Sequence, residues 1–129
     1  MPYKYLASPY SHVDFNVMQR RFEATERALA WLLKRKIWAY SPIVQCHVLA
    51  QRYALPTDAA YWRQYNEAMM RGSEGILVLL LGGWRDSAGV AAEIRYARAQ
   101  DRSVQYLYPT ERDDYHFSTE SKDAPKVNA

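Results

Sequence analysis

The chain has 129 residues, which is enough for one domain with a sizeable hydrophobic core but not comfortably for two. Nearly half of the residues are apolar and 14% are aromatic, so the composition is that of a globular protein and not of a disordered one. Its 17 basic and 14 acidic residues leave an excess of +3 that is scattered without a basic run. Binding to a nucleic-acid polymer therefore has little support.

Apolar runs and cysteine content exclude two further classes of protein. The longest apolar run, 76–81, is too short to cross a bilayer, and residues 3–7 have the pattern of a strand and not of a signal segment. The single cysteine, Cys46, excludes an internal disulfide and a multi-cysteine metal site. We therefore expect a cytoplasmic protein without membrane contact.

Apolar periodicity predicts strands that alternate with helices, and proline, glycine and capping residues mark their ends. This alternation predicts an α/β fold with a mostly parallel sheet and helices on both faces. The expected elements are, in chain order, a strand at 3–7, a helix from a capping signal at 11–14 to about 35, a strand at 37–40, a short helix or irregular segment at 43–53, a helix from 57–58 to about 70, the central strand at 76–81, a helix from 86–87 to about 100 and a strand at 103–108.

Two of these helices show an apolar face, and the end of the chain shows none. The inward face of the first helix is expected to contain Met18, Phe22, Thr25, Leu29 and Leu32. The inward face of the helix that ends at Gly72 is expected to contain Tyr61, Tyr65, Ala68 and Met69. We divide the chain into an α/β domain at 1–109 and a polar C-terminal tail at 110–129, which is either disordered or a short arm on the domain or on a partner subunit.

The stretch 76–93 carries the most informative pattern. A buried strand is followed by two glycines at 82–83, by the capping residues Asp86 and Ser87, and by a helix that contains Glu93. Open α/β sheets build binding sites in this way at the carboxyl ends of their strands. The helix start would also present free N–H groups, including that of Gly89, to an anion such as phosphate.

Three loops, 8–12, 41–47 and 82–89, are expected to meet at one edge of the sheet and form a shared site. Glu93 is there either a solvated carboxylate or a nucleophile that attacks the anomeric carbon of a sugar. Asp86 and Ser87 are either caps alone or caps that also bind a phosphate or sugar hydroxyls. Tyr5 is either a core residue or, near the strand end, a phenol that orients a catalytic carboxylate.

Other side chains of this edge have weaker signals. The two histidines on loops have no Cys and no second His at the spacing of metal ligands, which argues against a metal site. His12, at a helix start, is a candidate to neutralise an anion. Trp84 or Tyr10 is a candidate to stack on a base. The glycine and lysine patterns of dinucleotide-binding and ATP-binding loops are absent, and so is the serine nucleophile elbow.

The segments 5–10, 40–43 and 83–89 with Glu93 together resemble the nucleoside 2-deoxyribosyltransferase superfamily over residues 3–108. More narrowly, they resemble a group of short uncharacterised bacterial and phage proteins and the 2′-deoxynucleoside 5′-phosphate N-hydrolases. The strongest shared motif is the D-S-x-G-x-x-x-E run at 86–93.

This resemblance implies a flavodoxin-like or Rossmann-like three-layer fold with a central, mostly parallel sheet of four to five strands. It assigns the nucleophile to Glu93, its orienting phenol to Tyr5 and contact with a 5′-phosphate to Ser87. It also implies a homodimer or higher homo-oligomer, with a neighbouring subunit often completing the site, and no metal or organic cofactor.

The chain departs from the family pattern at two places. Asn66 occupies a position where the family has Asp, and an amide can hydrogen-bond a sugar or base but cannot accept a proton. Ser11 and His12 stand where the phosphate-binding branch has an Arg, which leaves Arg20 or Arg21 as the alternative cation.

From these residues we expect cleavage of the N-glycosidic bond of a 2′-deoxyribonucleoside 5′-monophosphate, by hydrolysis and not by base exchange. The alternative is a non-catalytic nucleotide-binding or sensor module on the same fold. In either case the partner is a small nucleotide or nucleoside. The expected substrate-binding residues are Ser8, His12, Asn66, Asp86, Ser87 and Gly89.

Overall fold

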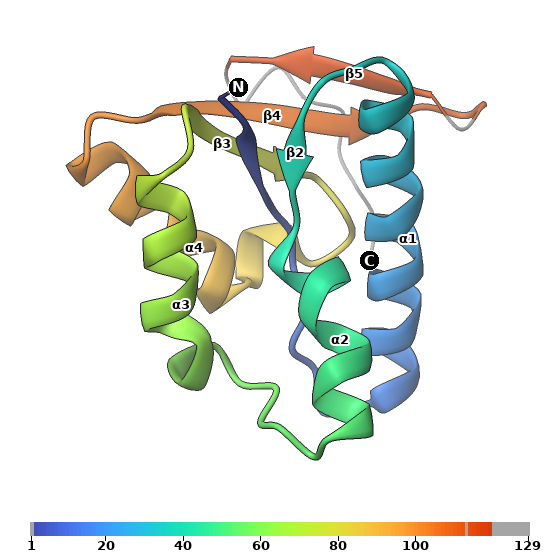
Figure 1. The fold of residues 1–129 in the computed structure, drawn as a ribbon. Helices are drawn as coiled ribbons and strands as arrows, with labels where there is room; N and C mark the ends of the chain where they lie inside the picture. The colour runs from blue at the N-terminus through green and yellow to red at the C-terminus, as the bar shows by residue number, and fades with distance from the viewer. Residues whose placement is uncertain (1, 113, 120–129) are drawn as a thin grey trace.

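A computed structural model describes residues 2–112 and 114–119, which form a five-stranded sheet in the order β2-β1-β3-β4-β5 (Figure 1). The first four strands are parallel, and β5 runs antiparallel to β4. The strands are β1 (Lys4–Ala7), β2 (Ala39–Tyr40), β3 (Gly75–Leu79), β4 (Ser103–Pro109) and β5 (Tyr115–Ser118). The helices are α1 (Phe15–Lys34), α2 (Pro42–Arg52), α3 (Ala59–Arg71) and α4 (Ala88–Ala99), with a short 3₁₀ turn, η1 (Trp84–Asp86), between β3 and α4.

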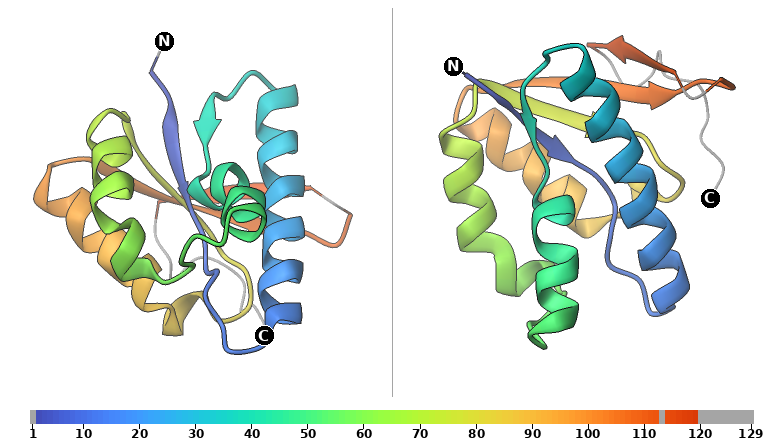
Figure 2. Two further views of the ribbon diagram at one scale, coloured as in Figure 1. Left: turned by 60° about the horizontal axis from the view of Figure 1, so that its bottom comes forward. Right: turned by 45° about the vertical axis from the view of Figure 1, so that its right-hand side comes forward.

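Helices cover both faces of this sheet, α1 on one side and α3 with α4 on the other (Figures 1 and 2). Because side chains alternate along a strand, each central strand feeds two separate hydrophobic layers. In β1, Tyr5 and Ala7 belong to the layer that includes Met70 of α3 and Val90 of α4. Leu6 belongs to the layer on the α1 side. The expected α/β fold with a mostly parallel sheet is thus confirmed, and its strand order and layers are those of a flavodoxin-like fold.

Hydrogen-bonding caps decide where two of the helices begin. The segment that the sequence left open at 43–53 is helix α2, because Ser41 accepts the N–H of Val44 at 3.1 Å and a proline occupies the first helical position. Helix α1 begins at Phe15 and not after Ser11, because the carboxylate of Asp14 caps it. The hydroxyl of Ser11 instead donates to the carbonyl of Thr57.

The expected inward face of α3 is wrong for three of its four residues, and Met69 alone of the four packs against the core. Tyr61 and Tyr65 are 51% and 40% exposed, and Ala68 is exposed as well. The inner side of α3 carries Met70, which is buried, and the half-buried Asn66. A polar residue lies on that side because it borders a cavity, so the apolar periodicity of the sequence did not mark the buried face.

Part of the expected polar tail belongs to the sheet. Strand β5 pairs with β4, and the side chain of Trp31 on α1 donates to the carboxylate of Asp114 at 2.9 Å. The ring of Trp31 also lies 5.2 Å from that of Tyr115. Residues 115–118 therefore form an arm on their own domain, whereas 120–129 lie outside the described residues.

Candidate functional site

A cavity of about 570 Å³ opens at the carboxyl ends of the parallel strands. Its wall contains Ser8 after β1, Pro42 after β2 and Gly83 after β3. The order of the strands reverses between β1 and β3, and open α/β sheets bind ligands at such a switch point. Residues of all three segments that the sequence indicated line one cavity, although residues 42–47 are the start of α2 and not a loop. Helix α3 adds a fourth side with Trp62 and Asn66.

Most of the candidate residues line this cavity, and Tyr5 and Trp84 do not. Those in its wall are Ser8, Tyr10, His12, Asn66, Asp86, Ser87, Gly89 and Glu93. The indole of Trp84, in contrast, packs against the core, 6.0 Å from the ring of Tyr106, with the guanidinium of Arg85 over it at 4.7 Å. The turn at Gly83 directs the side chain of Trp84 to the sheet and away from the cavity. The tryptophan that lines the cavity is instead Trp62 of α3.

Glu93 of α4 receives a hydrogen bond from the hydroxyl of Tyr5, a residue 88 positions earlier on β1. Tyr5 is fully buried in the core and Glu93 is half-buried. The ring of Tyr5 packs in the core, as one interpretation expected, and its hydroxyl donates to Glu93, which lines the cavity. A role in orienting a catalytic carboxylate stays a prediction. This bond engages Oε2 of Glu93 and leaves Oε1 without that partner.

Burial raises the pKa of Glu93 to about 7, and the hydrogen bond from Tyr5 opposes that rise. Burial, followed by the adjacent Glu93 carboxylate, raises the pKa of Tyr5 well above its usual value. Tyr5 therefore stays protonated and donates, while Glu93 changes charge near neutral pH. A carboxyl group of this kind in a cleft is typical of catalytic sites.

The start of α4 forms another part of the wall. Gly83 adopts a left-handed conformation with φ of 86°, and the η1 turn then leads to Ser87, the helix cap. The oxygen of Ser87 accepts the N–H of Val90 at 3.1 Å, so its hydroxyl proton is available to a ligand. The next two N–H groups belong to the first helical turn, which has no intrahelical acceptors for them. Asp86 does not act as the cap and is exposed.

Arg21 of α1 is the one of the two expected arginines that lines the cavity, whereas Arg20 is exposed. Its guanidinium donates to the carbonyls of Ser11 at 3.1 Å, Tyr10 at 3.4 Å and Gly82 at 3.5 Å. The sequence named Arg20 and Arg21 as alternative cations and did not decide between them. The direction of Arg21 depends on the packing of α1 against the glycine turn, which no local signal records.

His47 of α2 is a wall residue for which the sequence offered no role. Its Nδ1 is hydrogen-bonded to the hydroxyl of Tyr10, and its Nε2 lies 2.9 Å from the amide oxygen of Gln19. The ring stacks on Phe22 at 4.1 Å, and burial lowers the pKa of His47, which keeps it neutral. His47 therefore fixes Tyr10 in place. His12 is exposed, and its Nδ1 accepts the N–H of Asp14.

Asn66 carries an unsatisfied group in this wall. Its side-chain oxygen is buried and has no hydrogen-bond partner among the described residues. Asn66 and Glu93 also line a neighbouring cavity of about 420 Å³ between α3 and α4. A buried acceptor without a partner is unfavourable by about 1–3 kcal/mol, so a donor on a ligand would stabilise the site.

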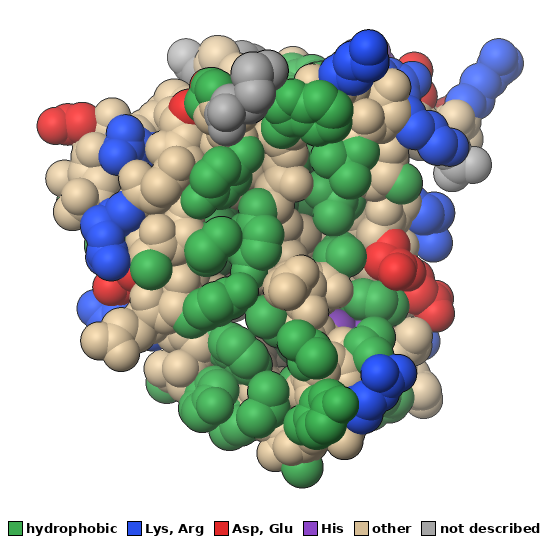
Figure 3. Space-filling view, viewed as in Figure 1, with side chains coloured by type: hydrophobic (Ala, Val, Ile, Leu, Met, Phe, Trp, Pro, Cys, Tyr) green, Lys and Arg blue, Asp and Glu red, His purple; other side chains and the backbone are tan. Residues whose placement is uncertain are grey.

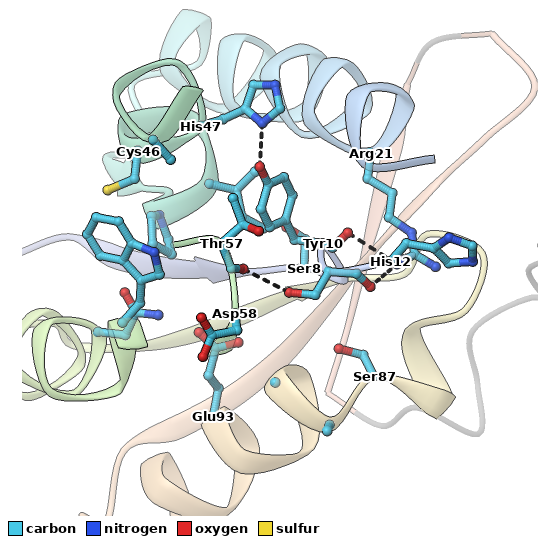
Figure 4. A pocket seen from close by; sticks show the side chains of 18 of the residues that line it. Ser8, Tyr10, His12, Arg21, Cys46, His47, Thr57, Asp58, Ser87 and Glu93 are labelled. Carbon is cyan, nitrogen blue, oxygen red and sulfur yellow. Dashed lines mark hydrogen bonds between the residues drawn. The ribbon is translucent and has the colours of Figure 1, made fainter. Parts of the chain in front are cut away.

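The cavity has two chemically different ends. Figure 4 shows Arg21, His12 and Ser87 toward one end, Cys46 toward the other, and Glu93 between them. The first end offers a guanidinium, a hydroxyl and helix N–H groups, which suit an anion. Cys46 belongs to α2, and Ile43 and Ala50 of the same helix and Trp62 of α3 also line the cavity. These side chains suit an apolar or aromatic group.

Residues 3–108 match the family described as a domain of unknown function (DUF1937). The chain belongs to this family. A comparison with curated proteins found no match. In the part of the chain that the structure describes, no group of three or more His, Cys, Asp or Glu side chains is placed to hold a metal ion. None of the helices in that part is both long and apolar enough to span a membrane.

The raised pKa of Glu93 predicts a pH-dependent stability. Folding favours the protonated form, so the stabilisation is complete below the usual pKa of 4.5 and is lost as pH rises through about 7. Wild type should therefore lose stability as pH rises from 5 to 8, whereas Glu93→Gln should not lose it in this way. Over that range, the free energy of unfolding of Glu93→Gln should increase by about 1–3 kcal/mol relative to that of wild type. Urea denaturation at both pH values measures this, with exposed Glu111→Gln as control. An equal response of the two variants would contradict the assignment.

Proposed function

We propose that this protein cleaves the N-glycosidic bond of a 2′-deoxyribonucleoside 5′-monophosphate, with Glu93 as nucleophile. The observation that carries the proposal is the Tyr5–Glu93 pair on the cavity wall, where a carboxyl with a pKa of about 7 has one oxygen bound by a phenol. The resemblance of the motif at 86–93 to the nucleoside 2-deoxyribosyltransferase superfamily supports the same role.

The reaction proceeds in two displacements. The free oxygen of ionised Glu93 attacks C1′ of the sugar, the bond from C1′ to the base nitrogen breaks, and the base leaves with the electron pair. Water then attacks C1′ of the glycosyl ester. Its hydroxyl stays on the sugar, its proton balances the departed base, and the carboxylate of Glu93 is restored. Tyr5 orients the carboxylate and favours its ionised form.

The two ends of the cavity support a nucleotide as the substrate. The 5′-phosphate lies at the start of α4, where Ser87 and the N–H group of Gly89 donate to it, near Ser8 and His12. The base lies toward the apolar end against Tyr10 or Trp62, and Asn66 accepts a hydrogen bond from the sugar or base. We favour hydrolysis over base exchange because the site suits a phosphate.

The Asn66 amide also supports a second candidate function, a non-catalytic nucleotide-binding or sensor module. An amide at this position binds but cannot take up a proton, so the site retains recognition with less acid–base capacity. Binding without turnover would be its signature.

Base release distinguishes the two functions. Wild type, Glu93→Gln and the exposed control Glu111→Gln are incubated with deoxyribonucleoside and ribonucleoside monophosphates, and free base is followed by chromatography. We expect release from a deoxyribonucleotide by wild type and control, reduced at least about 1,000-fold in Glu93→Gln. The kcat/KM of wild type should rise with pH through about 7, and this limb should move to higher pH in Tyr5→Phe. Saturable binding without release by any variant would support the sensor and reject the enzyme.

The expected homo-oligomer requires a contact face, and α2 and α3 carry exposed apolar side chains that suit one. Apolar side chains gather over these helices in Figure 3, among them Tyr53, Tyr61 and Tyr65, which are 64%, 51% and 40% exposed. We propose that this face joins two copies beside the cavity. Sedimentation equilibrium should give a dimer for wild type and a larger monomer fraction for Tyr61→Glu, with Arg20→Gln as control. A monomeric wild type would refute this contact.

A further inference from the structure

Arg21 is a half-buried cation without a carboxylate partner among the described residues. The ion pairs in that part of the chain are Lys4 with Glu74 and Arg63 with Glu67. The hydrogen bonds of the Arg21 guanidinium go to the carbonyl oxygens of Ser11, Tyr10 and Gly82, at 3.1–3.5 Å, and burial lowers the pKa of this group. A charge that is withdrawn from water without a counter-charge is unfavourable, so an anion in the cavity would stabilise the arrangement.

The glycine turn after β3 provides the space that Arg21 occupies. A Cβ atom at Gly83 would lie 2.6 Å from Nη2 of Arg21, closer than van der Waals contact permits. The left-handed φ of Gly83 also turns the chain toward η1 and the start of α4. The same glycine therefore admits the guanidinium and sets the position of the helix start, which brings a cation and Ser87 to one end of the cavity (Figure 4).

The acidic residues of the cavity do not neutralise this cation. Glu93 accepts a hydrogen bond from Tyr5 and forms no ion pair with Arg21 in the described part of the chain. Asp58 caps α3 through the N–H of Tyr61, and no ion pair joins Asp58 or Asp86 to Arg21 there. Both carboxylates belong to exposed residues, where water screens them. The half-buried guanidinium remains the charge that decides recognition at this end.

We propose that Arg21 is the residue that selects a phosphate monoester over an unphosphorylated nucleoside in this cavity. Its guanidinium would replace the weak carbonyl contact to Gly82 by charge-assisted hydrogen bonds to two phosphate oxygens. The identity of the rest of the ligand rests on the proposed function. The selection itself does not depend on turnover.

Binding to the Glu93→Gln protein tests this selection without turnover. Calorimetric titrations compare the four common 2′-deoxynucleoside 5′-monophosphates, the matching nucleosides and inorganic phosphate. Adding Arg21→Gln should weaken binding of the monophosphates by about 10- to 100-fold and leave nucleoside binding unchanged. Arg21→Lys should lie between, because it keeps the charge and loses the planar fork. The neighbouring variant Arg20→Gln should behave as its parent.

Three results would overturn the inference. The first is an equal loss of monophosphate and nucleoside binding in Arg21→Gln, which would make Arg21 a structural contact between loops. The second is no loss of binding of either ligand. The third is a preference for inorganic phosphate over every monophosphate. If Arg21→Gln does not fold, as judged by circular dichroism, Arg21→Lys decides, and it must weaken monophosphate binding selectively. Selective binding together with absence of base release by wild type would reject the proposed enzyme and leave this inference standing.

Discussion

The hydrogen bond from Tyr5 to Glu93 links β1, a strand in the interior of the sheet, to helix α4, which borders the cavity. Its geometry depends on both hydrophobic layers, because β1 is covered on one side by α1 and on the other by α3 and α4. A small shift of β1 or α4 would break the bond and leave a half-buried carboxyl without its donor. The core therefore acts on the chemistry directly, since its packing sets the orientation and the pKa of Glu93.

The cavity owes its shape to the reversal of strand order between β1 and β3. At that point the chain leaves β1 toward α1 and leaves β3 through the glycine turn toward α4, so two loops diverge and a space remains between them. Helix α2 and the inner side of α3 close the space, one with His47 and the other with Asn66. Polar side chains from several elements therefore line a cavity that lies directly against the hydrophobic core.

Local sequence patterns predicted the parts of this arrangement that depend on local physics. The apolar run at 76–81 predicted the central strand, and the pattern beyond it predicted capping at Asp86 and Ser87, of which Ser87 is the cap of α4. The stripe on the first helix was also largely correct, since Met18, Phe22, Thr25 and Leu32 are buried there. In each case one short segment contained the whole signal.

The features that the sequence did not determine depend on contacts between distant segments. The direction of Arg21 is set by a glycine more than sixty residues away, and the indole of Trp84 is drawn to Tyr106 on β4. The apolar face of α3 was assigned mostly to the wrong side because the inner side of this helix lines a cavity and carries the polar Asn66 there. Periodicity measures apolarity, and a binding wall is not uniformly apolar.

The central claim is that Glu93 becomes covalently bound to the sugar during turnover. The most direct measurement is to quench the wild-type protein with acid during the reaction and to map its peptides by mass spectrometry. We expect the peptide containing Glu93 to gain the mass of one 2-deoxyribose 5-phosphate unit, attached at that carboxylate. An adduct on another residue, or an unmodified Glu93 peptide throughout a reaction that releases base, would contradict the claim.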